Sequence, residues 1–151
     1  ELFRRMIFNI LVDNTDDHEK NHSLLVVNPL ANGRLKLAPA YDVVPTNSGQ
    51  GFQEFICGAR GRDSTLDNAM SQCDAFGLRP AQAAADVAVV IDVVNSWQDH
   101  FAHAGVTARD ISSLAERLDG DALLSQRTGF DSSRFQRSPT KRKRPGPFRR
   151  A

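Results

Sequence analysis

The sequence contains little cysteine and no long apolar run, and both absences limit what the protein can be. Its 151 residues include only Cys57 and Cys73, in no Cys-x-x-Cys or Cys/His spacing. Two such thiols exclude a disulfide framework and a structural zinc site, and they favour small core residues in a reducing, cytoplasmic setting. The most apolar stretch, residues 87–94, is too short to span a membrane and contains Asp92, so we expect no membrane partner.

A secretory signal is also missing from the start of the sequence. Glu1 opens the chain inside an amphipathic pattern, with no apolar run and no cleavage site behind it. We interpret the sequence as a fragment of a longer chain or a trimmed one. The net charge of +1 is unevenly distributed, because residues 131–151 hold eight Lys and Arg and one acid, which leaves eleven bases and seventeen acids in residues 1–130. The body is therefore acidic and the tail is basic.

Apolar periodicity and breaker residues predict a mostly helical α+β domain over residues 1–130, followed by a Ser/Pro/Arg-rich tail, residues 131–151, that we expect to be disordered. The predicted helices cover residues 1–12, 64–76, 79–105, 107–118 and 121–127. Two strands, residues 22–27 and 33–38, form a predicted hairpin with one face inward and one outward. The aromatic residues expected in the core are Phe3, Phe8, Phe76, Trp97 and Phe101.

A polar octet, Asn-Thr-Asp-Asp-His-Glu-Lys-Asn at residues 14–21, separates the first predicted helix from the hairpin. Phosphoryl transfer needs a carboxylate to orient the attacking hydroxyl and oxygen ligands for magnesium. Asp16 and Asn21 stand five positions apart, and the hairpin would return Asp42 to the same place. The alternative is a solvated turn, because Asn, Thr and Asp are ordinary turn residues. No role can be derived for Asp17.

Three stretches, FNILVDNTDDHEKNHSLL, RLKLAPAYDVVPT and GRDSTLDNAMSQCDAFGL, follow one another in an order that resembles the C-terminal part of HipA-family kinases. The resemblance covers residues 1 to about 118. It implies a protein-kinase-like C-terminal lobe, with a catalytic loop at residues 14–21, a metal-binding segment at 38–46, an activation-type loop at 47–63 and helices over 64–127. It also implies the serine/threonine kinase toxin of a bacterial toxin–antitoxin pair.

The same resemblance implies roles for individual residues. Asp16 matches the catalytic aspartate, and Asn21 and Asp42 match the magnesium ligands that hold Mg²⁺ and ATP. His18 matches a position that contacts phosphate or orients Asp16, and Lys20 matches a position beside the nucleotide, although an exposed surface lysine is the plainer interpretation. The implied partners are a protein substrate, with an aminoacyl-tRNA synthetase as the best-known kind of target, and a helix-turn-helix antitoxin that binds DNA.

One departure from the family pattern concerns the N-terminal lobe, which in kinases covers the nucleotide and supplies a strand lysine. The catalytic loop begins so early that we expect this lobe to be absent and the isolated chain to be inactive. Of the four lysines, Lys20, Lys36, Lys141 and Lys143, none precedes the loop. The alternative function is a truncated, inactive module that only binds the partners of the family. A weaker one is DNA binding through the basic tail, residues 141–150.

Overall fold

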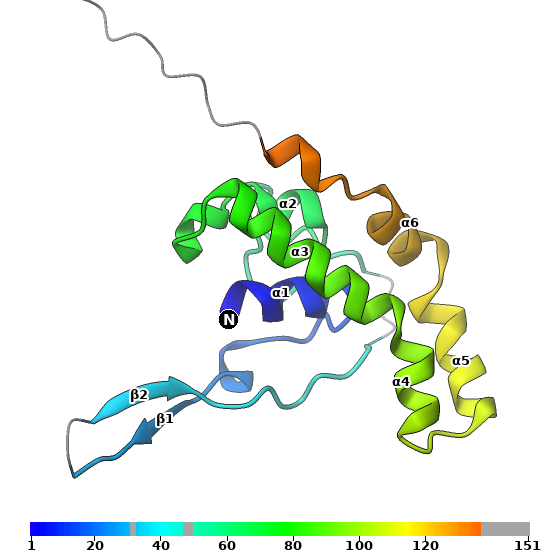
Figure 1. Ribbon diagram of the computed structural model, residues 1–151, viewed down its shortest axis with the longest axis horizontal. Helices are drawn as coiled ribbons and strands as arrows, with labels where there is room; N and C mark the ends of the chain where they lie inside the picture. The colour runs from blue at the N-terminus through cyan, green and yellow to red at the C-terminus, as the bar shows by residue number, and fades with distance from the viewer. Residues whose placement is uncertain (31–32, 47–49, 137–151) are drawn as a thin grey trace, which may run out of the picture.

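The computed structural model describes residues 1–30, 33–46 and 50–136, and it has the predicted α+β architecture (Figure 1). Within these residues the chain is mostly helical with one antiparallel hairpin. The α-helices are α1 (Leu2–Leu11), α2 (Leu66–Met70), α3 (Pro80–Asn95), α4 (Trp97–His103), α5 (Ala108–Leu118) and α6 (Asp121–Gly129). The remaining elements are the strands β1 (Leu24–Val27) and β2 (Arg34–Leu37) and the 3-10 helices η1 (Glu19–Asn21), η2 (Cys73–Phe76) and η3 (Ser132–Phe135). None of the helices in this part of the chain is long and apolar enough to cross a membrane.

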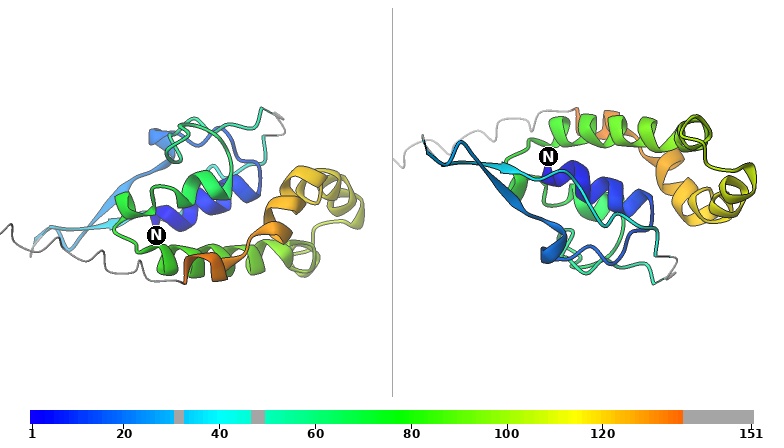
Figure 2. Two further views of the ribbon diagram at one scale, coloured as in Figure 1. Left: turned by 90° about the horizontal axis from the view of Figure 1, so that it is seen from above. Right: turned by 90° about the horizontal axis from the view of Figure 1, so that it is seen from below.

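Helix α1 is the centre of the core, and Figure 2 shows it between α3 on one side and a layer of loops on the other. Its apolar residues recur at helical spacing, so that Phe3, Ile7, Ile10 and Leu11 point the same way and are buried. Of the aromatic residues predicted in the core, Trp97 is buried, whereas Phe8 and Phe101 pack against the core from partly buried positions. Phe76 is 40% exposed, so the prediction for that residue is wrong.

Two predicted helices are each broken in the structure, and a serine stands at both breaks. Residues 79–105 divide into α3 and α4 because the Ser96 hydroxyl donates to the Val93 carbonyl at 2.9 Å. Residues 64–76 divide into α2 and η2, because the Ser71 hydroxyl donates to the Asn68 carbonyl at 2.6 Å. In each case the serine occupies a carbonyl that the next helical turn would have used, which is how Ser competes with helix continuation.

The hairpin projects from one end of the helical body, as both views of Figure 2 show. Its register pairs Leu24 with Leu37 and Val27 with Arg34. All four residues of β1 are exposed, and Leu35 of β2 is 62% exposed. The predicted inward face is therefore wrong for most of the hairpin, since among its described residues only Leu37, at the base of β2, is half-buried.

Helix α5 lies at the end opposite the hairpin, and the chain then returns along α3, against which η3 packs (Figure 2). Leu118 at the end of α5 is buried, and Phe130 and Phe135 pack against the core cluster. The predicted disorder starts too early, since Ser132–Phe135 form η3 with Asp131 capping it through Ser133 N–H at 2.9 Å. Residues 137–151, the rest of the predicted tail, lie outside the described residues.

Candidate functional site

The octet begins where α1 ends, in a turn that fixes the direction of the chain. Asp13 adopts a left-handed φ of 56°, and Asn14 N–H donates to the Asn9 carbonyl at 2.9 Å. This 6→1 bond around a left-handed residue is the Schellman arrangement that closes many helices. Asn14 and Asn9 are both buried, and Asn14 Nδ2 donates to Asn9 Oδ1 at 3.2 Å. The start of the loop is therefore rigidly attached to the central helix.

Thr15, the residue before Asp16, is held by two other segments of the chain. Its N–H donates to the Thr46 hydroxyl at 3.3 Å, and the two threonine hydroxyls share a further hydrogen bond. Its carbonyl accepts from the Glu54 N–H at 3.1 Å. The segments 41–46 and 50–57 thus meet the octet immediately before its first predicted catalytic residue.

Asp16 and Asn21 are tied to each other within the loop. Asp16 is exposed, while Asn21 is buried on η1 and its Nδ2 donates to the Asp16 backbone carbonyl at 3.3 Å. Because the amide nitrogen of Asn21 makes this contact, Oδ1 is the atom of that side chain suited to bind a cation. The loop thus presents a free-standing carboxylate at one end and an amide at the other.

Asp42 lies on a segment that is fastened to the octet on both sides. The Tyr41 hydroxyl donates to the Lys20 carbonyl at 2.8 Å and forms a hydrogen bond with Ser23 Oγ at 2.7 Å. Further along, the N–H and the hydroxyl of Thr46 both donate to the Asp13 carbonyl at 2.9 Å. Asp42 itself is exposed and has a left-handed φ of 56°, a backbone conformation that costs energy for residues other than Gly and is tolerated best by Asn and Asp.

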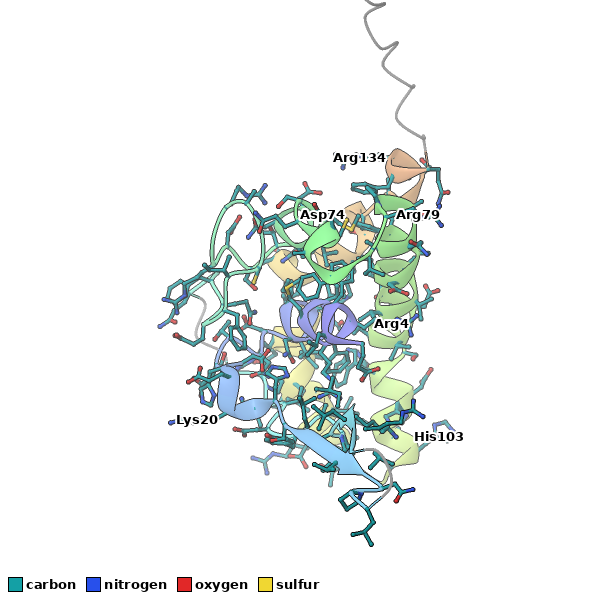
Figure 3. All side chains as sticks on the ribbon, turned by 90° about the vertical axis from the view of Figure 1, so that its left-hand side faces the viewer. Arg4, Lys20, Asp74, Arg79, His103 and Arg134 are labelled. Atoms are coloured by element: carbon teal, nitrogen blue, oxygen red, sulfur yellow. The ribbon has the colours of Figure 1, made fainter. Side chains whose placement is uncertain are left out.

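His18 and Lys20, the other two predicted residues of the site, differ in their surroundings. His18 is half-buried, and its Nδ1 is a buried atom without a hydrogen-bond partner among the described residues. Lys20 is exposed, at the outer edge of the molecule in Figure 3. Its placement agrees with the plainer of the two interpretations, a surface lysine.

Asp17 is a residue of the loop for which no role could be derived from the sequence. It is only 8% exposed, and its Oδ1 lies 3.0 Å from His22 Nε2. The His22 ring in turn packs against the Phe55 ring, with 5.7 Å between centroids. An Asp and a His five positions apart around a turn are a weak sequence signal, and only the fold shows that the two side chains meet.

The donor chemistry of the loop suits a hard cation that brings some ligands of its own. Residues 1–30, 33–46 and 50–136 contain no group of three or more His, Cys, Asp and Glu able to enclose a metal. Carboxylate and amide oxygens are nevertheless the ligands that magnesium takes from proteins, usually one or two, with water and phosphate oxygens completing the shell. Asp16, Asn21 and Asp42 fit that incomplete set better than a site closed by protein atoms.

Comparison with known proteins identifies the family. The model of the HipA-like C-terminal domain matches residues 1–100 of the chain. The chain belongs to the HipA family. The matched part of this HipA-family chain includes the octet, the hairpin and the segments 41–46 and 50–57, and therefore all five predicted site residues. Comparison with curated proteins and with solved structures gives no match.

Proposed function

We propose that this chain carries the catalytic and metal-binding residues of a HipA-like protein serine/threonine kinase, the toxin of a toxin–antitoxin pair. The observation that supports the proposal is the attachment of the Asp42 segment to the octet, through the contact of Tyr41 with Lys20 on one side and of Thr46 with Thr15 on the other. These contacts fasten the segment that bears Asp42 to the loop that bears Asp16 and Asn21. Phosphoryl transfer requires the catalytic carboxylate and the metal ligands, here Asp16, Asn21 and Asp42, to act together on the same phosphoryl group.

In the proposed reaction the Asp16 carboxylate orients a serine or threonine hydroxyl of a protein substrate and accepts its proton as the γ-phosphoryl group of ATP is transferred. Its exposure suits this role, because a substrate chain must reach it. Asn21 and Asp42 would hold Mg²⁺, which neutralises charge on the nucleotide phosphates. His18 would orient Asp16 or contact a phosphate. The cytoplasm supplies ATP, and the partners remain those of the family: a protein substrate and a DNA-binding antitoxin.

The chain by itself is expected to transfer phosphate slowly. Kinases grip the nucleotide phosphates with a lysine from a strand that precedes the catalytic loop. In this sequence no lysine precedes Asp16, and Lys36 lies on the exposed hairpin. A sample restricted to these 151 residues therefore has no such positive clamp and lacks much of the positioning that accelerates the reaction.

Cation binding tests the proposal without depending on turnover. Mn²⁺ is added to the full chain, and paramagnetic broadening of amide resonances is recorded by NMR. We expect broadening at Asp16, Asn21 and Asp42 together, and its loss in the Asp42→Asn variant, which removes a proposed metal ligand. Asp74→Asn, at an exposed acid on η2, is the matched control and should leave the broadening unchanged. Broadening of the octet without Asp42 would contradict the shared site.

A second candidate, a non-catalytic binding module, has an observation in its favour. The hairpin exposes a set of apolar side chains that the described part of the chain leaves uncovered: Leu24, Leu25, Val26, Val27 and Leu35. Exposed apolar surface of this kind often marks an interaction site. A chain that binds no Mn²⁺ and no ATP, yet still binds an antitoxin or a protein substrate of the family, would favour this candidate over the kinase.

A further inference from the structure

The pair of buried Asp17 and half-buried His22 occupies a specific place in the loop. Asp17 directly follows the proposed catalytic Asp16, and His22 directly follows the proposed metal ligand Asn21. The contact between Asp17 Oδ1 and His22 Nε2 at 3.0 Å therefore joins the two ends of the loop. It runs beside the Asn21–Asp16 bond, which joins the same two ends through the backbone carbonyl of Asp16.

We infer that Asp17 and His22 are positioning residues, which act through their neighbours and hold Asp16 and Asn21 at a fixed separation. The inference rests on the proposed function for its catalytic meaning, but the contact itself does not. Two hydrogen bonds side by side restrict rotation about the loop ends far more than either bond alone. Catalytic groups need this restriction, since displacement by about 1 Å costs a large part of the rate.

The surroundings of His22 extend the same support to a third segment. Its ring lies against Phe55, and Glu54, the residue before Phe55, donates its N–H to the Thr15 carbonyl. The segment 50–57 therefore holds the loop at Thr15, before Asp16, and at His22, after Asn21. A change in the position of Phe55 would therefore displace His22 first, and through His22 the loop that it closes.

A simple contribution to stability is the competing explanation for the pair. Buried ionic and polar pairs contribute little net stability, because desolvation offsets most of their attraction. Two acidic residues close to Asp17 in the sequence, Asp16 and Glu19, are exposed to solvent and have no histidine partner like His22 in the part of the chain that the structure describes. The inward orientation of Asp17 is thus better explained by its ordering of the loop than by a contribution to the stability of the core.

Hydrogen exchange on the metal-free full chain tests the inference. In Asp17→Ala and His22→Ala we expect amide exchange at Asn21, whose N–H donates to the His18 carbonyl, to accelerate about tenfold or more. Exchange in α3 should stay unchanged. The matched control is Arg60→Ala, which removes an exposed ion pair to Asp63 in the neighbouring loop and should leave the octet protected. Equal acceleration in the octet and α3, or none in the octet, would overturn the inference.

Two further variants separate positioning from general damage. Asp17→Asn keeps an acceptor oxygen at the same place and should restore most of the protection. The double variant Asp17→Ala/His22→Ala should exchange no faster than either single one, because both remove the same contact. Additive effects would show that the residues act independently and would overturn the inference.

Mn²⁺ binding to the same variants then connects the pair to the proposed site. If wild-type chain binds Mn²⁺, Asp17→Ala and His22→Ala should weaken binding about fivefold or more, with Asp17→Asn close to wild type. Unchanged binding would overturn the positioning role. If wild-type chain binds no Mn²⁺, the proposed function fails, and the exchange experiment still decides whether the pair orders the loop.

Discussion

At the residue scale, the loops of this protein are held by single buried polar side chains that each make several hydrogen bonds. Asn68 on α2 is fully buried. Its Nδ2 donates to the carbonyls of Gly61 and Asp63, and its Oδ1 accepts from the Arg60 N–H. One amide thus satisfies three backbone groups of the loop that follows the proposed site, a task that no apolar side chain could perform.

Cys57 is expected to be an unreactive thiol. Burial, with smaller contributions from Asp63 and Asp17, raises the pKa of Cys57 to about 11. Because only the thiolate reacts, iodoacetamide at pH 8 should label Cys57 about a hundredfold more slowly than a thiol with a pKa near 9. Mass spectrometry of the native chain measures the rate, and the urea-unfolded chain provides the control. Fast native labelling would show that the loop around Cys57 opens readily.

Asp13 should reduce stability at neutral pH. Burial raises the pKa of the Asp13 carboxyl, and attraction to Arg117 opposes the effect only in part. Because the pKa of Asp13 is higher in the folded state, its contribution to stability is fully present below the pKa of the unfolded state, about 4. That contribution is lost as the pH rises through the pKa of the folded state. Asparagine also tolerates the left-handed φ at this position. The Asp13→Asn variant should therefore be more stable than wild type at pH 7, but no more stable than wild type at pH 3.5. Urea unfolding at both pH values measures the difference; a larger gain at pH 3.5 would contradict the assignment.

The sequence provided candidates for the residues that carry chemistry, but none for the residues that support them. Asp16, Asn21 and Asp42 were selected because their spacing around a hairpin matches a known chemical need, and their convergence on a cation remains a prediction. Asp17, His22 and Tyr41 were not selected, although their side chains make the contacts that shape the loop. Such contacts depend on where the chain returns in space, which local spacing does not encode.

At the element scale, Gly58 marks the closest approach between the loop of residues 50–63 and α2. A Cβ at this position would lie 1.8 Å from the Asn68 backbone carbonyl oxygen and 2.6 Å from Ser71 Oγ. Gly58→Ala must therefore push the loop away from the helix, and we expect it to cost about 3 kcal/mol of unfolding free energy. Thermal denaturation measures the change.

Gly129 provides the matched control for that substitution. It ends α6, and a Cβ there would meet nothing within 4 Å. Gly129→Ala should be neutral or slightly stabilising, since alanine loses less backbone entropy on folding. Equal destabilisation by the two substitutions would mean that the contact between Gly58 and Asn68 does not limit stability.

Element boundaries were the least predictable part of the fold. The helical periodicity of residues 79–105 continues through Ser96, so the pattern alone predicts one helix. At the break that the Ser96 hydroxyl makes, Trp97 turns into the core and donates Nε1–H to Asp119 at 3.2 Å. Burial of a large aromatic residue stabilises the fold by more than the loss of a few helical hydrogen bonds costs. The burial of Trp97 depends on tertiary contacts, which the sequence pattern does not show.

At the scale of the whole molecule, Arg127 connects the helices at the end opposite the hairpin. The residue is buried, and its guanidinium donates to the Leu118 carbonyl at 2.6 Å and to Asp119 Oδ1 at 2.7 Å. Asp119 also accepts hydrogen bonds from Trp97 and Gln98. One cation and one carboxylate thus connect α4, the end of α5 and α6.

Arg127→Ala should leave the Asp119 carboxylate without its cation and remove the donor to the Leu118 carbonyl. We expect a loss of about 2–3 kcal/mol, at the lower end for a buried pair because Asp119 retains some contact with water. Chemical denaturation measures this loss. Arg134→Ala, which removes a long, exposed contact to Asp67, is the control and should change stability very little. A similar loss in both variants would contradict the connecting role.

The segment that matches the family model and the hydrophobic core have different limits along this chain. The family match stops at residue 100, inside α4, but the interior is completed by Leu118, Phe130 and Phe135, and Gln126 reaches back to the N–H of Leu66. A protein limited to residues 1–100 would lose the apolar burial that the later residues provide. We expect this loss to cost more than about 5 kcal/mol, which is comparable with the entire stability of a small domain. Such a protein should be insoluble or molten by near-ultraviolet circular dichroism, whereas residues 1–136 should melt in a single transition.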